Sequence, residues 1–189
     1  MTYLLIAPPA AEVLTLAEAK AHLRLDGADE DDLLSSLIRV AREHLERTTG
    51  LCLLTQSWRL YLDSLYEEGV IQIAKGPVQA IESVTVFDAD GVASSPSLEG
   101  HVLDGASRPA RLLLPSPLRA GRAVNGIEID FTAGYGDSAA DVPETLKRAM
   151  LTHVAQMFSC RGVVAPDEQP ALIPAGYDRL VAPYALRGL

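Results

Sequence analysis

The chain has 189 residues, 48% hydrophobic and 22% charged, which suits one folded domain or one domain carrying an insertion. Its 16 basic and 25 acidic residues give a net charge of −9, which excludes the basic field that a general nucleic-acid binder needs. The apolar N-terminal stretch has no basic residue and is broken by Pro8 and Pro9, so it predicts neither a signal peptide nor a membrane span. Cys52 and Cys160 stand alone, which indicates buried thiols in a reduced, intracellular protein.

Two helices are predicted in the first quarter of the chain. A Thr-Leu-Ala-Glu sequence has the pattern of a capping box and predicts a short helix over residues 15–25. Asp29 is the expected cap of a longer helix over residues 29–50, in which leucine and isoleucine recur at helical spacing. Gly50 suits the left-handed conformation that ends such a helix.

The period of the pattern then changes from helical spacing to alternation. Apolar residues alternate with others, or form short runs bounded by glycine and proline, as in half-buried strands. The sequence predicts strands at residues 58–62, 70–74, 78–88, 101–103, 111–114 and 127–131. An Asp90-Gly91 pair after the third of these is a hairpin signal.

A third helix is predicted over residues 144–161, with Pro143 at its start and Asp141 as a cap. Its apolar stripe is expected to pack against the helix over residues 29–50, because neither helix can bury its stripe alone. The strands lie between these helices in sequence and are expected to form a separate small sheet or sandwich.

The segment over residues 163–189 is predicted to be an extended arm. Its four prolines oppose a long helix and remove ladder donors. It is nevertheless too rich in apolar residues for a disordered tail, so we expect it to lie on another surface. Its apolar anchors are Leu172, Ile173, Tyr177, Leu180, Val181, Tyr184 and Leu186.

The sequence as a whole predicts an α+β fold with a helical core, an inserted antiparallel β subdomain and an extended C-terminal arm. The N-terminal helical part covers residues 1–54 and the inserted β subdomain covers residues 55–136. The C-terminal core helix covers residues 137–162, and the docking arm covers residues 163–189.

Several short patterns point to chemistry but have simpler explanations. The acidic run over residues 26–32 lacks the ligand order of a calcium loop and is interpreted as helix capping. Gly134 and Gly136 lack the Lys-Ser/Thr pair of a phosphate-binding loop and indicate a turn. No histidine has metal-ligand spacing, and the chain has no G-x-S-x-G elbow. The sequence therefore predicts no catalytic residue, no metal site and no cofactor.

Four side chains on the two long predicted helices have two interpretations each. Arg39, Arg42 and Arg47 form either a solvated face paired with nearby glutamates or a contact with acidic neighbours or DNA. His153 lies on an apolar helical face, which favours a hydrogen-bonded core or interface histidine over a metal ligand.

Two stretches carry a family resemblance. The first is LTLAEAKAHLRLDGADEDDLLSSLIRVAREHLERTTG followed by LLTQSWRLYLD, and the second is FTAGYGDSAADVPETLKRAMLTHVAQMF. In this order they resemble the head–tail connector (adaptor) proteins of long-tailed phages, a family with relatives in prophages and gene transfer agents. The resemblance covers residues 14–161.

The resemblance implies a structural protein that is not an enzyme. Its subunits form a ring, usually of twelve copies, between the capsid portal and the tail or neck, and DNA passes through the channel without sequence-specific binding. The implied partners are further copies of the chain, the portal protein and a stopper or tail-terminator protein, with no membrane. The implied location is the bacterial cytoplasm during assembly and then the neck of a virion or gene transfer agent particle.

On this reading the arm residues named above are the candidates for docking on the portal. The candidates for contacts within the ring are Arg39, Arg42, Arg47 and His153. Two alternatives stay open. One is a neighbouring neck component, a stopper or tail terminator, although these are mainly small β folds. The other is an intracellular α+β enzyme or ligand-binding domain, which would hold a closed pocket with converging polar groups.

Overall fold

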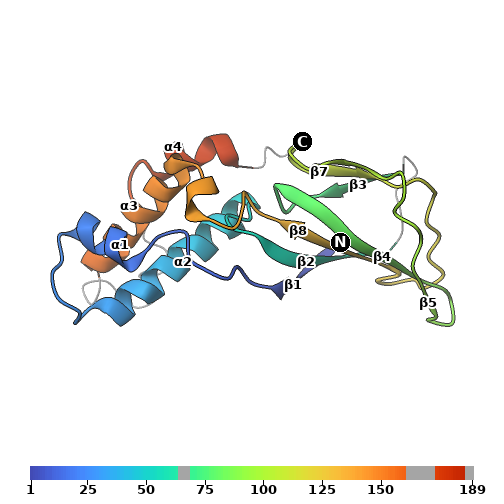
Figure 1. Cartoon of the computed structure of the whole chain (residues 1–189), viewed down its shortest axis with the longest axis horizontal. Helices are drawn as coiled ribbons and strands as arrows, with labels where there is room; N and C mark the ends of the chain where they lie inside the picture. The colour runs from blue at the N-terminus through green and yellow to red at the C-terminus, as the bar shows by residue number, and fades with distance from the viewer. Residues whose placement is uncertain (64–68, 161–172, 186–189) are drawn as a thin grey trace. The chain divides into compact units, whose positions relative to one another are not determined.

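The computed structural model describes residues 1–63, 69–160 and 173–185 (Figure 1). The fold is α+β, as the sequence predicts, and it divides into two compact units. The β unit contains residues Met1–Ala10 and Thr55–Tyr135, and the helical unit contains Ala11–Leu54 and Gly136–Leu189. Each unit is therefore assembled from two separate stretches of the chain.

The β unit contains two antiparallel sheets. The first has the strand order β1-β2-β8-β4-β5, with bounds Thr2–Ala7, Gln56–Leu62, Ile127–Ala133, Val78–Phe87 and Ala93–Ser94. The second has the order β3-β7-β6, with bounds Val70–Ile73, Ala110–Leu113 and Val102–Asp104. Every predicted strand is present. The Asp90-Gly91 signal forms the turn between β4 and β5, where the Asp88 carboxylate accepts hydrogen bonds from the backbone of Asp90 and Val92.

The core of the β unit lies on one face of β8. Ile127, Ile129 and Phe131 alternate along this strand and are fully buried. The opposite face is polar, where Arg59 of β2 pairs with Asp130 at 2.6 Å and holds the pKa of that carboxyl below its usual value. The alternation of β8 in sequence therefore reports its two environments correctly.

Two hydrogen bonds fix how the sheets face each other inside this unit. The Tyr3 hydroxyl of β1 accepts from the Ala74 amide at the end of β3, at 2.8 Å. The Val78 amide at the start of β4 donates to the Gly105 carbonyl after β6, at 3.0 Å. A side chain on Gly105 would lie 2.1 Å from the Val78 carbonyl oxygen, which explains the glycine. The β3 edge therefore lies on the β1 side, and the β6 edge lies on the β4 side.

Strand β1 corrects the predicted division of the chain. Residues 1–10 belong to the β unit, whereas the sequence analysis placed residues 1–54 in the helical part. The strand is a sheet edge with exposed residues on both faces, and its residues Leu4–Ala7 are nevertheless a continuous apolar run. It lacks the alternation by which a half-buried strand is recognised.

The helical unit contains α1 (Leu16–Leu23), α2 (Asp31–Thr49), α3 (Glu144–Cys160), α4 (Tyr177–Val181) and the 3₁₀ turns η1 (Ala139–Asp141) and η3 (Ala182–Tyr184). The capping box of α1 is confirmed, because Thr15 and Glu18 bond each other's backbone and side chain. Helices α2 and α3 pack together as predicted. No helix in the described ranges is long and apolar enough to cross a membrane.

Two predicted helix caps are wrong. Glu30 rather than Asp29 is the N-cap of α2, and it makes no side-chain cap bond. The start of α2 is instead fixed by Lys20 of α1, whose ammonium lies 2.7 Å from the Asp31 carboxylate. Asp141 caps the preceding turn η1, where its carboxylate accepts from the Ser138 amide. At α3 the competing partner is local, because the Ser138 amide takes the Asp141 carboxylate that the pattern assigned to the helix.

The predicted extended arm contains short helical turns within the described residues 173–185. Residues Tyr177–Val181 form α4 and Ala182–Tyr184 form η3. Two of the prolines, Pro174 and Pro183, flank the helical turn without interrupting α4. Gly176 supplies the left-handed backbone, at φ 91°, from which the helix begins. The prolines give no indication of this short helix.

Candidate docking site on the helical unit

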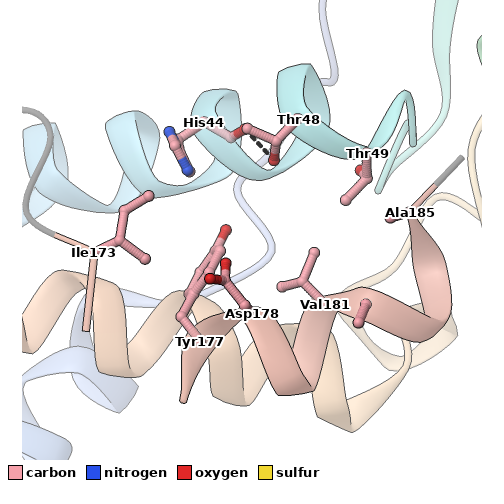
Figure 2. Close-up of a pocket in the computed structure, with 9 residues that line it drawn as sticks. His44, Thr48, Thr49, Ile173, Tyr177, Asp178, Val181 and Ala185 are labelled. Atoms are coloured by element: carbon pink, nitrogen blue, oxygen red, sulfur yellow. Dashed lines mark hydrogen bonds between the residues drawn. The ribbon is translucent and has the colours of Figure 1, made fainter. Parts of the chain in front are cut away.

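Helix α4 packs against α3, and its Tyr177 ring reaches His44 of α2 (Figure 2). Tyr177 and Val181 are four residues apart and therefore share one face of α4. They are only 3% and 6% exposed. The apolar residues of the C-terminal segment are thus partly covered by the chain's own helices, and the segment is docked in the single subunit.

Three aromatic rings from three helices meet beneath α4. The ring centres of His44 and His153 are 5.1 Å apart, and Tyr177 lies 5.9 Å from His44 and 5.5 Å from His153. Figure 2 shows the Tyr177 ring rising from α4 towards α2, close to His44 and Thr48. The cluster joins all three helices at one point.

Four polar atoms of this cluster are buried without a hydrogen bond to any described residue. Within the described ranges, neither ring nitrogen of His153 has a partner, and the same holds for His44 Nε2 and the Tyr177 hydroxyl. His153 is therefore a core histidine, but it lacks the hydrogen bond that the sequence analysis expected. Leaving such groups unpaired costs about 1–3 kcal/mol each, so the docking of α4 is weaker than its apolar contacts alone would make it.

Burial also sets the charge state of the cluster. It lowers the pKa of His153 to about 4, with a smaller effect from His44. The pKa of His44 is lowered by burial and by Arg47, against the opposing effect of Asp178. Burial raises the pKa of Tyr177 to about 12. All three rings are therefore uncharged at neutral pH.

A hollow of about 300 Å³ lies beside the cluster. It is lined by residues of α2 and of the C-terminal segment: His44, Thr48, Thr49, Ile173, Tyr177, Asp178, Val181, Ala182 and Ala185. In the part of the chain that the structure describes, no group of three metal-ligating side chains is present. The hollow thus resembles an incompletely filled packing interface more than a site for chemistry.

Removing the Tyr177 hydroxyl should strengthen this interface. In a Tyr177→Phe variant the ring contacts remain and an unpaired buried hydroxyl is lost, so we expect stability to rise by about 1 kcal/mol. Urea denaturation monitored by circular dichroism measures the change. A loss of stability would instead show that the hydroxyl has a partner in solution.

A buried ion network holds the other side of α2. Arg42 is 8% exposed, and its guanidinium bonds Glu12 at 2.8 Å and Glu46 at 2.9 Å. The second oxygen of Glu46 accepts the Leu53 amide at 2.8 Å. Burial opposes the charge of Arg42, but the two carboxylates outweigh it and raise the pKa. This network ties Glu12, which precedes α1, and Leu53, which follows α2, to Arg42 and Glu46 of α2.

The structure places the predicted site residues in different surroundings. Tyr177 and Val181 face their own subunit, while Leu180 and Tyr184 are half-buried and Ile173 is 40% exposed. Leu172 and Leu186 lie outside the described residues.

Of the predicted ring-contact residues, Arg42 and His153 are buried inside the subunit, because one is needed for the ion network and the other for the ring cluster. Arg39 and Arg47 are exposed.

Sequence reasoning assigned no role to His44 or to Glu12. A signal for His44 was available, because it lies three residues after the buried Ala41 and seven after Leu37, beside the apolar stripe of α2. Glu12 had no such signal. Its partner Arg42 is thirty residues away in sequence and is reached only through the fold.

Comparison with known proteins supports one identity. Residues 13–96 match the family described as phage gp6-like head-tail connector protein. No curated protein sequence matches the chain significantly.

Solved structures match over the whole chain. One is the neck of an empty gene transfer agent particle solved with C6 symmetry, with TM-score 0.82, 25% identity, and coverage of 100% of this chain and 97% of that chain. Another is the virion of a native gene transfer agent particle, with TM-score 0.79, 26% identity and the same coverage. A third is the neck of a native particle solved with C12 symmetry, with TM-score 0.78, 27% identity and again the same coverage.

The family is structural rather than enzymatic, which agrees with the sequence prediction. The matched segment contains α1, α2 and strands β2 to β5, and the likeness of fold extends over the remainder. The family-model match and the likeness of the whole fold to neck proteins together support a structural connector (adaptor) role for the chain.

Proposed function

We propose that this connector forms a closed ring of twelve copies in the neck of a phage-like particle, between the portal and a stopper or tail-terminator protein. The observation that carries the proposal is the whole-chain likeness to neck structures of gene transfer agent particles, one of them solved with C12 symmetry. A cyclic ring requires contacts in which two different surfaces of each copy meet. We infer assembly in the bacterial cytoplasm, followed by a place in the mature neck.

The C-terminal segment is the proposed contact with the portal. Tyr177 and Val181 anchor it on the subunit, and this leaves Ile173, Leu180 and Tyr184 as the described residues that can reach a partner. Each buried apolar side chain contributes about 1.5–3 kcal/mol, against about 1–2 kcal/mol for ordering each residue. One arm therefore binds weakly, and twelve arms on one ring bind together.

The acidic charge suits a channel for DNA. A net charge of −9 per copy leaves no general attraction for phosphates, so a ring of such copies would let DNA pass without holding it. This part of the proposal fails if the residues that line the channel are mainly lysine and arginine.

The test is to mix the purified chain with purified portal rings and weigh the products by native mass spectrometry. We expect portal particles that carry about twelve added copies of the chain. A double variant, Ile173→Glu with Leu180→Glu, should stay folded and fail to join the portal, whereas the exposed Val92→Glu control should join it. A wild-type chain that never joins the portal would overturn the proposal.

A further inference from the structure

We propose that neighbouring copies in the ring join through their β units, with the free edge of β1 in one copy pairing with the free edge of β6 in the next. This inference rests on the ring in the proposed function and names the surfaces that would build it. It assigns the main subunit contact to the sheets rather than to α2 and α3.

Strand β1 is an unprotected edge. It pairs with β2 alone, and its six residues include no charge and no proline. Leu4, Leu5 and Ile6 are 48%, 41% and 51% exposed, and their side chains occupy both faces of the strand. Soluble proteins normally protect such an edge with charge, proline or a covering element. An edge without these features is suited to pairing with a strand from another chain.

A second apolar edge lies at β6. Val102 of this strand is 61% exposed and pairs with Leu113 of β7, which is 45% exposed. The other sheet edges are less suitable. Strand β5 has only two residues, and β3 lies on the same side of the unit as β1, where Tyr3 bonds Ala74.

The two apolar edges lie on opposite sides of the β unit. The bond from Tyr3 to Ala74 places β3 beside β1, and the bond from Val78 to Gly105 places β6 beside β4. Copies joined from β1 to β6 therefore continue head to tail, which is the arrangement that a ring requires. Pairing of β1 with β1 would instead close a two-fold dimer and leave no edge for a third copy.

The charge distribution favours the contact between β1 and β6 over contacts through charged surfaces of the subunit. Each copy carries a net charge of −9, so identical surfaces repel unless they are locally neutral. Strand β1 carries no charge, and Asp104 of β6 is already paired with Arg111 at 2.7 Å. The ladder is short, because β6 has only three residues. A single contact is therefore weak, and closure of the ring supplies the stability.

Substitutions on the two edges test the proposal on the full chain mixed with portal. Leu4→Lys with Ile6→Lys places two charges on one face of β1, and Val102→Lys places one charge on β6. Each variant should reduce ring formation at least tenfold. Val92→Lys and Val124→Lys serve as matched controls, since both residues are 63% exposed in the same unit, and they should form rings like the wild type.

Mixing the two edge variants gives a sharper result. Each keeps one intact edge, so the mixture should form heterodimers without closed rings. Rings from either variant alone would overturn the inference, as would an effect of the β1 variant with none from Val102→Lys, which would indicate β1–β1 pairing. Wild-type rings that tolerate both variants would leave the proposed function standing, whereas absence of wild-type rings would overturn both.

Crosslinking covers the case in which a lysine variant fails to fold, which circular dichroism would reveal. In a Cys160→Ser background, Leu4→Cys with Val102→Cys and a bismaleimide should give a ladder of linked copies. Either cysteine alone should give no ladder, because Cys52 is buried. A doubly substituted chain that yields no ladder within assembled rings would contradict the β1-to-β6 contact.

Discussion

Replacement of Arg42 by alanine should lower the free energy of unfolding by about 3–5 kcal/mol, because it removes one partner of a buried ion network. The guanidinium lies 2.8 Å from Glu12 and 2.9 Å from Glu46, and its side chain is only 9% exposed. Alanine would leave both carboxylates partly buried without this cation. Urea denaturation at pH 7 measures the loss.

Arg39 provides the matched control on the same helix. Its side chain is 66% exposed and lies 3.9 Å from Glu12, so Arg39→Ala should change stability by less than about 0.5 kcal/mol. Equal effects of the two substitutions would show that the network contributes no more than a surface charge. The anchor from Glu46 to the Leu53 amide should also loosen in Arg42→Ala, which amide hydrogen exchange at Leu53 would report.

Acidification should weaken the ring cluster that docks α4. The pKa of His153 is lowered to about 4 from its usual 6.5, so the unfolded chain binds more protons between these values. The stabilising effect of the neutral ring is fully present above pH 6.5 and is lost as the pH falls towards 4. At 1.36 kcal/mol per pKa unit the loss reaches at most about 3 kcal/mol.

The matched variant is His153→Leu, which fills the buried position with an apolar side chain and removes the titrating group. We expect its stability to fall clearly less than that of the wild type between pH 6.5 and 4.5, because His44 is then the remaining titrating ring of the cluster. Unfolding curves across this range make the comparison, and the imidazole proton signals in NMR report the pKa of His153 directly. A wild-type histidine that titrates near pH 6.5 would contradict the buried cluster. Protonation of His44 should also destabilise the fold, because the pKa of His44 is lowered as well. Burial and Arg47 lower that pKa, and Asp178 raises it.

Periodicity in the sequence predicts the elements whose two faces differ in environment. The apolar stripe of α2 and the alternation of β8 each report one buried and one solvated face, and both elements lie where the pattern puts them. Strand β1 lacks this contrast, because both its faces are exposed at an edge, and it was missed. Helix α4 was missed for another reason. It spans little more than one turn, and its helical state depends on the surface against which Tyr177 and Val181 pack.

The candidate site likewise contains residues that the sequence predicts and contacts that it does not. The anchors in the C-terminal segment could be chosen from composition alone, since apolar residues there need a surface. The surface itself could not be found, because His44 contacts both Tyr177 and His153, which lie more than one hundred positions away in sequence. Buried charge gives no signal of its own, and Arg42 reads like its exposed neighbours Arg39 and Arg47 until the fold brings Glu12 beside it.

The discontinuous composition of the two units has a consequence for biosynthesis. The centre of the larger sheet is β8, so β2 and β4 have no strand between them until the ribosome has released residues 127–133. The apolar stripe of α2 likewise stays uncovered until α3 has been synthesised, and α3 in turn lacks its contact with α4 until the end of the chain is made. Neither unit can therefore close while the nascent chain is still short. Translation that stops early should yield fragments with exposed apolar faces, which are substrates for proteases rather than building blocks for a particle.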